Sequence, residues 1–154
     1  MVSHWLLRIG DGVNFINSSI HTIWGILSTS PMSKYFLKHV IEGDILWFIK
    51  SKSNGLVLAI ATFSHYEKRI IGDLINLSMT NDELGWNNDG SNSDTEIHYK
   101  NLYNLEECKL ETYIKGTSTI RKFSNDNYPL KCKIHLEDEY EKFIKYRNAR
   151  TSMI

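Results

Sequence analysis

The stretch VIEGDILWFIKSKSNGLVLAIATF, residues 40–63, decides the fold of this chain. It contains two apolar runs, 44–50 and 55–63, each of strand length. The residues between them, 51–55, are rich in turn formers, so the two runs predict a β-hairpin. Both runs are apolar on both faces, which indicates central strands of a sheet that is closed or covered on both sides.

Two strands and a short helix are expected at the start of the chain. Residues 4–9, HWLLRI, have strand character and end in a glycine-bracketed turn. The apolar residues Val13, Ile16 and Ile20 are spaced three and four apart, which predicts a short helix. Residues 23–26, IWGI, form an apolar run of strand length and predict a second strand.

The same kinds of signal predict further elements. Ser30-Pro31 marks a helix start, because serine caps helices and proline suits the first helical position, and Gly43 is placed to end that helix. Residues 80–94 carry many Asn, Asp, Gly and Ser residues around Trp86 and predict a long loop. The remaining prediction is strands over 69–78, 95–103 and 118–123, and a terminal helix over 136–147.

Composition predicts one packed domain over residues 1–154. The chain is 42% apolar and 12% aromatic with two prolines, which is typical of a globular domain. Its two cysteines, Cys108 and Cys132, show no CxxC spacing and are expected to be ordinary thiols. Together with the element order, this predicts an α+β fold whose curved, mostly antiparallel sheet forms a barrel flanked by helices.

Charge and hydropathy restrict the partners. Eighteen basic and eighteen acidic residues cancel, whereas proteins that hold a duplex through its phosphates are usually basic. Any affinity for nucleic acid is therefore expected to come from one well-formed pocket. The N-terminus has no cleavable signal pattern, and no stretch approaches the ~18 apolar residues of a membrane helix. We expect a cytoplasmic or nuclear protein without a membrane partner.

The ordered set of motifs resembles the EVE and YTH branch of the PUA-like families. Its parts are HWLL at 4–7, IWG at 23–25, VIEGDIL at 40–46 and LAIA at 58–61, followed by a strand that runs into a terminal helix over 130–140. LAIA has alanine where the family pattern has glycine, and residues 65–93 do not match the pattern. The resemblance implies a curved sheet with a pocket for a flipped-out or single-stranded modified base, N6-methyladenine or a modified cytosine, in RNA or DNA.

Five residues carry over from this resemblance. Trp24 would form one wall of an aromatic cage, and the backbone around Gly25 would contact the base. Asn14 would hydrogen-bond the base edge, since an amide offers both a donor and an acceptor. Arg8 and, from the late basic segment, Arg121 would contact phosphate. From the residues alone, Trp24 also suits a core strand, Asn14 a helix cap, and both arginines an ordinary surface.

The second cage aromatic falls where the resemblance ends. Trp86 is the candidate, because a large apolar ring in a polar loop needs burial or a ligand. Tyr66 and Tyr99 are alternatives. Two facing rings would stack on a base at roughly 1–3 kcal/mol per contact, and a methyl group buried between them adds about 0.8 kcal/mol. A modified base would therefore bind more tightly than a plain one.

Two other classes of function remain as rivals. We expect no enzyme, no cofactor and no metal site, because the histidines are scattered without HExxH or paired-ligand spacing, and no phosphate loop or GxSxG elbow is present. The ASCH domain, a relative in the PUA-like group, carries a Lys, Glu and Arg constellation, whereas residues 10–20 contain only Asp11 as a charge. The alternative function is a protein-interaction module, which the neutral net charge and the acidic segment 82–96 also suit.

Overall fold

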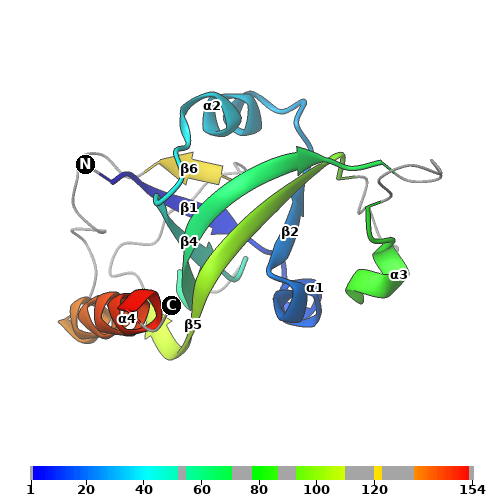
Figure 1. Ribbon diagram of the computed structural model, residues 1–154. Coiled ribbons are helices and arrows are strands. Elements are labelled where there is room, and N and C mark those ends of the chain that lie inside the picture. The colour runs from blue at the N-terminus through cyan, green and yellow to red at the C-terminus, as the bar shows by residue number, and fades with distance from the viewer. Residues whose placement is uncertain are drawn as a thin grey trace.

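The computed structural model gives a curved sheet with helices around it (Figure 1). It describes residues 2–51, 55–70, 78–86, 93–109, 120–122 and 134–152. In chain order the elements are β1 (His4–Arg8), α1 (Val13–Ser18), a 3₁₀ turn (Ser19–His21), β2 (Ile23–Ile26), α2 (Pro31–His39), β3 (Ile45–Ile49), β4 (Leu56–Lys68), α3 (Asn81–Leu84), β5 (Thr95–Lys109), β6 (Ile120–Lys122) and α4 (Ile134–Ser152).

The described strands form one six-stranded sheet in the order β2-β5-β4-β3-β1-β6. The β1–β3 pair is parallel, and the other four pairs are antiparallel. Strands β4 and β5 bend together across the molecule and give the sheet its half-barrel shape (Figure 1). The predicted α+β class, with a curved, mostly antiparallel sheet flanked by helices, is confirmed. No described helix is both long and apolar enough to cross a membrane.

The predicted hairpin is confirmed as β3 and β4, and both of its faces are covered. On one face, Phe48 packs in a core cluster with Phe15 of α1 and Phe36 of α2. On the other face, Trp47 packs in a second cluster that includes Phe143 of α4. All three helices therefore bury aromatic side chains against the sheet, which explains why the sequence of the hairpin is apolar throughout.

Asp44, in the Glu-Gly-Asp motif, ties three segments together from a buried position. Its Oδ1 accepts a hydrogen bond from the backbone N–H of Ser3 at 3.0 Å. Its Oδ2 accepts from the indole Nε1–H of Trp5 at 3.1 Å and from the backbone N–H of Ile41 at 3.0 Å. One carboxylate therefore joins the start of β1, the end of the α2 segment and the start of β3, so the motif has a structural role.

His4 shows that the opening HWLL motif also serves the core. Its Nδ1 accepts a hydrogen bond from the Trp47 indole at 3.1 Å, and its ring lies 5.5 Å from that of Tyr140. Burial lowers the pKa of His4 from 6.5 to about 4, against a smaller opposing effect of Asp44. The neutral ring is thus the form that the folded chain accepts, because a protonated Nδ1 cannot accept the Trp47 hydrogen bond.

This pKa predicts a loss of stability in mild acid. Well above pH 6.5, His4 is neutral in the folded and in the unfolded chain, and its contribution to stability is fully present. As the pH falls below 6.5 the unfolded chain takes up the proton first, and the folded chain follows only at about pH 4, so stability is lost between these values. At pH ~5 we expect a loss of about 2 kcal/mol, measured by urea unfolding. His4→Gln should remove this part of the pH dependence, and exposed His39→Gln should not. Equal pH profiles for the wild type and His4→Gln would contradict the prediction.

The structure corrects the expected details of several elements. The helix predicted over 13–20 forms as α1 but ends at Ser18, so Ile20 falls in the 3₁₀ turn. It buries Phe15 and Ser18, and the spaced residues Val13, Ile16 and Ile20 are exposed. The reason is that the 23–26 strand and the sheet receive the Phe15 face. No strand covers Arg69, Ile70 or Ser78, and 71–77 lie outside the described residues. The predicted loop 80–94 contains the one-turn helix α3, which Thr80 and Glu83 close with a capping box.

Three of the remaining predictions from the later sequence are borne out in outline, whereas, of the strand expected over 130–134, residues 130–133 lie outside the described residues and Ile134 already belongs to α4. Strand β6 occupies the middle of the predicted 118–123 strand. The predicted strand 95–103 is the first part of β5, and the predicted terminal helix 136–147 lies within α4. Cys108 belongs to β5, whereas Cys132 falls outside the described residues. Strand β5 and helix α4 both extend further than their apolar patterns indicated, because helix and strand ends are determined by hydrogen bonding as well as periodicity.

Candidate functional site

The structure brings together Trp24, Gly25 and Trp86, three of the residues predicted to contact a base. Trp24 and Gly25 lie in β2, at one edge of the sheet, and Trp86 follows α3. The Trp24 and Trp86 ring centroids are 5.9 Å apart. A side chain at Gly25 would collide with Ser93 Oγ and lie 2.7 Å from Cη2 of Trp86, so only glycine lets these groups approach the strand.

The two tryptophan rings meet edge to face, at an interplanar angle of 76°. A base stacked between parallel rings needs them roughly 7 Å apart, twice the usual contact distance between carbon atoms. Trp24 is half-buried and also meets Phe15, whose centroid is 6.0 Å away. Trp86 is 5% exposed. The rings therefore pack on each other in this structure and leave no base-sized gap between them.

Local sequence explains how Trp86 reaches β2. The capping box of Thr80 and Glu83 begins the one-turn helix α3, and Gly85 ends it with a φ of 74°, in the left-handed region. The carbonyl of Gly85 accepts a hydrogen bond from the Asn17 side chain of α1 at 2.7 Å. The indole Nε1–H of Trp86 is buried and has no hydrogen-bond partner among the described residues, which is unusual for a buried donor.

Arg69, which sequence analysis did not select, holds this region against the sheet. Its guanidinium carbon lies 5.0 Å from the Trp86 ring centroid, a cation–π geometry. The same group donates to the carbonyl of Met79 at 2.9 Å and to Ser93 Oγ at 3.2 Å. Its Nε is 3.6 Å from Glu96 Oε2, an ion pair longer than a hydrogen bond, with both side chains almost fully buried. Through these contacts Arg69 holds the Trp86 ring in position.

Asp94 fixes the other side of the cluster. Its carboxylate accepts hydrogen bonds from the Ser28 backbone N–H at 2.8 Å and from the Ser28 hydroxyl at 2.7 Å. Desolvation opposes ionisation of this group, but the hydrogen bonds from Ser28 and Thr95 outweigh it and lower the pKa of Asp94 below its ordinary value. The ionised carboxylate thus joins the end of β2 to the start of β5.

The other predicted contact residues lie on three different elements. Asn14 is half-buried in α1, next to Phe15, which touches Trp24. Arg8 ends β1 and Arg121 is exposed in β6, and these strands form the edge of the sheet opposite β2. The strand order alone does not bring either arginine to the tryptophans.

The two alternative aromatics occupy different environments. Tyr66 is 47% exposed on β4 and pairs with Ile97 of β5. Ile97 pairs on its other side with Trp24 of β2, so one strand separates the two aromatic residues. Tyr99 is buried in the core, with its ring 5.0 Å from that of Phe48, and desolvation raises its pKa. Of the three candidates for the second cage aromatic, Trp86 is thus the one in ring contact with Trp24.

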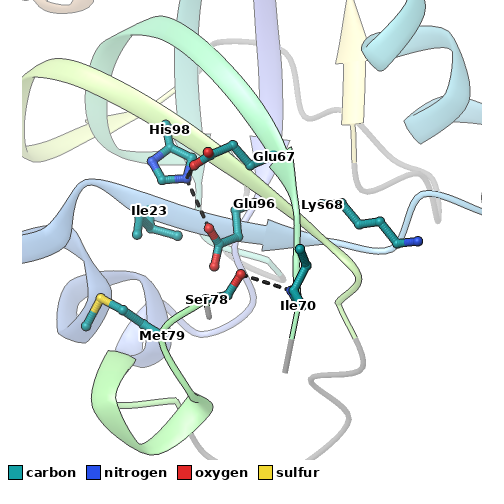
Figure 2. Close-up of a pocket in the computed structure, with 8 residues that line it drawn as sticks. All are labelled: Ile23, Glu67, Lys68, Ile70, Ser78, Met79, Glu96 and His98. Carbon is teal, nitrogen blue, oxygen red and sulfur yellow. Dashed lines mark hydrogen bonds and ion pairs between the residues drawn. The ribbon is translucent and has the colours of Figure 1, made fainter. Parts of the chain in front are cut away.

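An open pocket of about 640 Å³ lies beside the aromatic cluster. Figure 2 shows Ile23 and Met79 on its apolar side and His98 next to the carboxylates of Glu67 and Glu96. The ammonium group of Lys68 points away from these carboxylates (Figure 2). The lining thus carries two carboxylates and one lysine that is turned away from them, and the charge beside His98 suits a cation better than a phosphate group.

Sequence analysis passed over His98, Glu67 and Glu96 because each histidine was considered within its own segment. A signal was present in the letters: H-x-E at 65–67 and E-x-H at 96–98 place each pair on one face of a strand. Only the pairing of β4 with β5 brings the two His–Glu pairs together into one group.

Comparison with known proteins finds solved chains of similar structure but no match in sequence. No protein-family model matches the chain, and no curated protein matches it. A solved structure that is similar is that of a point mutant of ZmASCH from Zymomonas mobilis, with 8% sequence identity, coverage of 92% of this chain and 94% of that chain, and a TM-score of 0.49. The proposed function therefore rests on the geometry of the site.

Proposed function

We propose that this chain binds single-stranded or flipped-out nucleic acid and reads a modified base at Trp24 and Trp86, without catalysing a reaction. The observation that carries the proposal is the convergence of Trp24, Gly25 and Trp86 from two separate segments, with a buried indole N–H that finds no partner in the described part of the chain. The motif order that resembles the EVE and YTH branch supports the same assignment, because Trp24 and Gly25 carry it.

Binding in this way requires the two rings to separate. Their edge-to-face contact has to open so that a base stacks on Trp24 and Trp86 swings aside with its turn. The gain is stacking of roughly 1–3 kcal/mol per ring, together with a partner for the Trp86 N–H. Asn14, Arg8 and Arg121 are proposed as the contacts to the base edge and the phosphates. The cost of opening lowers the affinity for every base by the same factor, so the preference for a modified base has to come from the contacts that it makes in the open site.

The test is a titration of labelled oligonucleotides by fluorescence anisotropy at stated salt. The strands would carry plain, N6-methyladenine or 5-methylcytosine versions of one sequence, as RNA and as DNA. We expect one modified strand to bind about tenfold more tightly than the plain one, or better. Trp24→Ala should remove this preference because a stacking surface is lost.

Tyr35→Ala is the matched control, since Tyr35 is also a partly exposed aromatic residue but lies on α2. Its affinities should equal those of the wild type. Equal binding of all strands by the wild type, or a modified-base preference that survives Trp24→Ala, would refute base reading at this site.

A second candidate function is a protein-interaction module. The observation that favours it is the stripe of Val13, Ile16 and Ile20, which are 46%, 61% and 81% exposed. Val13 and Ile16 belong to α1 and Ile20 to the 3₁₀ turn that follows it, and exposed apolar side chains gathered in one short segment commonly mark a protein interface. Absence of nucleic-acid binding in the titration would make this the preferred function.

A further inference from the structure

Strands β4 and β5 bring two histidines and two glutamates together on one face of the sheet. In the strand register His65 lies opposite His98, and Glu67 lies opposite Glu96. Residues directly opposite in an antiparallel pair have Cβ atoms roughly 4.5–5.5 Å apart, and residues two apart share a face. The four side chains thus form a compact group beside the pocket described above.

A β-bulge creates this arrangement. Phe63 pairs with Tyr99 and His65 pairs with His98, so Ser64 is an extra residue in β4. Without it, the alternation that buries Phe63 would turn His65 to the core face as well, opposite Ile97. With it, His65 and Glu67 face the same side as His98. Bulges often re-aim side chains in this way next to functional sites.

We propose that His65, Glu67 and His98 bind a divalent transition-metal ion, with zinc as the reference ion. Their ligand atoms all lie within 4.8 Å of one another. The Glu67 Oε2 atom is 2.9 Å from His98 Nε2 and 3.5 Å from His65 Nε2. Tetrahedral zinc with bonds of about 2.0–2.1 Å separates its ligand atoms by roughly 3.3 Å, so both distances are close to those of a bound ion.

The two imidazoles need only a rotation to converge on one ion. Their rings stack with centroids 4.5 Å apart and planes 11° apart, so their nitrogen lone pairs run side by side. The side chains of His65 and Glu67 are 54% and 57% exposed, so turning them loses little packing. Three protein ligands leave the fourth position of a tetrahedral ion for water or for a ligand atom in the pocket.

The electrostatics favour a cation at this point. His98 Nε2 has a second carboxylate oxygen, Glu96 Oε1, at 3.0 Å, so two carboxylates approach one ring nitrogen that can carry one hydrogen (Figure 2). Arg69 pairs with the other oxygen of Glu96, and the Lys68 ammonium points away. A bound cation would be attracted by Glu67 directly and by Glu96 from its buried position.

The experiment uses the full chain without a histidine tag, treated with a chelator and then desalted. Zn²⁺ is added by isothermal titration calorimetry, and Co²⁺ by visible absorption, which reports the ligand geometry. We expect one ion per chain and an affinity reduced about tenfold or more in His65→Ala and in Glu67→Gln. Both residues are exposed, so these variants should keep the wild-type circular dichroism spectrum.

His39→Ala and Glu42→Gln are the matched controls, because both residues are exposed and lie outside the cluster. They should bind both ions like the wild type. The proposal is overturned if the wild type takes up neither ion, or if His65→Ala and Glu67→Gln bind them as tightly as the controls. Neither variant alters Trp24 or Trp86, so oligonucleotide binding by the same proteins separates this site from base reading.

Discussion

Replacing Arg69 with methionine is expected to lower the free energy of unfolding by about 3–5 kcal/mol. Methionine retains the length of the side chain but removes the charge that faces Glu96, whose side chain is 5% exposed. A buried carboxylate without its cation is strongly unfavourable, because desolvation is no longer offset by the ion pair. The carbonyl of Met79 and the Trp86 ring also lose their contacts with the guanidinium group.

The measurement is urea unfolding of the wild type and the variant at one pH. Arg121→Met is the matched control, since Arg121 is an exposed arginine on an edge strand and its loss should change stability by at most about 0.5 kcal/mol. Adding Glu96→Gln to Arg69→Met should recover part of the loss, because the double variant leaves no unpaired charge. Equal stability of Arg69→Met and Arg121→Met would contradict the buried ion pair.

Arg69→Met also bears on the proposed function. Because Arg69 holds the Met79 carbonyl, Ser93 and the Trp86 ring together, its removal should loosen the turn that carries Trp86. If base reading takes place there, the variant should lose its preference for the modified strand at temperatures where it is still folded. A retained preference would show that base reading does not depend on the contacts of Arg69 with the Trp86 segment.

Asp44→Ala is expected to destabilise the fold by about 3–5 kcal/mol. Three donors lose a charged acceptor: the N–H groups of Ser3 and Ile41 and the indole N–H of Trp5. The first two are partly buried and can be rehydrated, whereas the indole of Trp5 is fully buried and stays unpaired. Hydrogen bonds to charged groups contribute roughly 1.5–3 kcal/mol each, and rehydration reduces the sum.

Asp44→Asn separates the two parts of this effect. The amide oxygen can still accept from Trp5, but its NH₂ group turns a donor toward Ser3 or Ile41, so the loss should be smaller than for alanine. Exposed Asp138→Ala on α4 is the control and should stay within about 0.5 kcal/mol of the wild type. Thermal unfolding with two optical probes would check that each transition is two-state. A loss below 1 kcal/mol in Asp44→Ala would mean that the three hydrogen bonds matter little.

Much of the fold was predictable from the sequence because it depends on local signals. The hairpin 44–63 combines two apolar runs with a turn, so its strands and their double coverage were predictable. Ser30 and Pro31 begin α2 as expected, with the Ser30 hydroxyl accepting from the Ser33 backbone N–H. The face of α1 was not predictable, because a six-residue helix has too few turns for spacing to identify its buried side.

The candidate sites show the same division. The resemblance of the motif order selected Trp24 and Gly25, and the composition of the 80–94 segment selected Trp86 as a ring in need of burial. The sequence could not show that the Trp24 and Trp86 rings meet at 76°, because that angle depends on how the segment after α3 packs on β2. Arg69 was missed because nothing local marks an arginine that will be buried against Glu96.

The sequence by itself determined the α+β class, the central hairpin and the helix start at Ser30, because short-range periodicity, turn residues and caps act within a few residues. Tertiary structure alone decided the pairing of His65 with His98 and of Glu67 with Glu96. The reason is strand register: one extra residue, Ser64, sends every following side chain of β4 to the other face, and no pattern within either strand reports it.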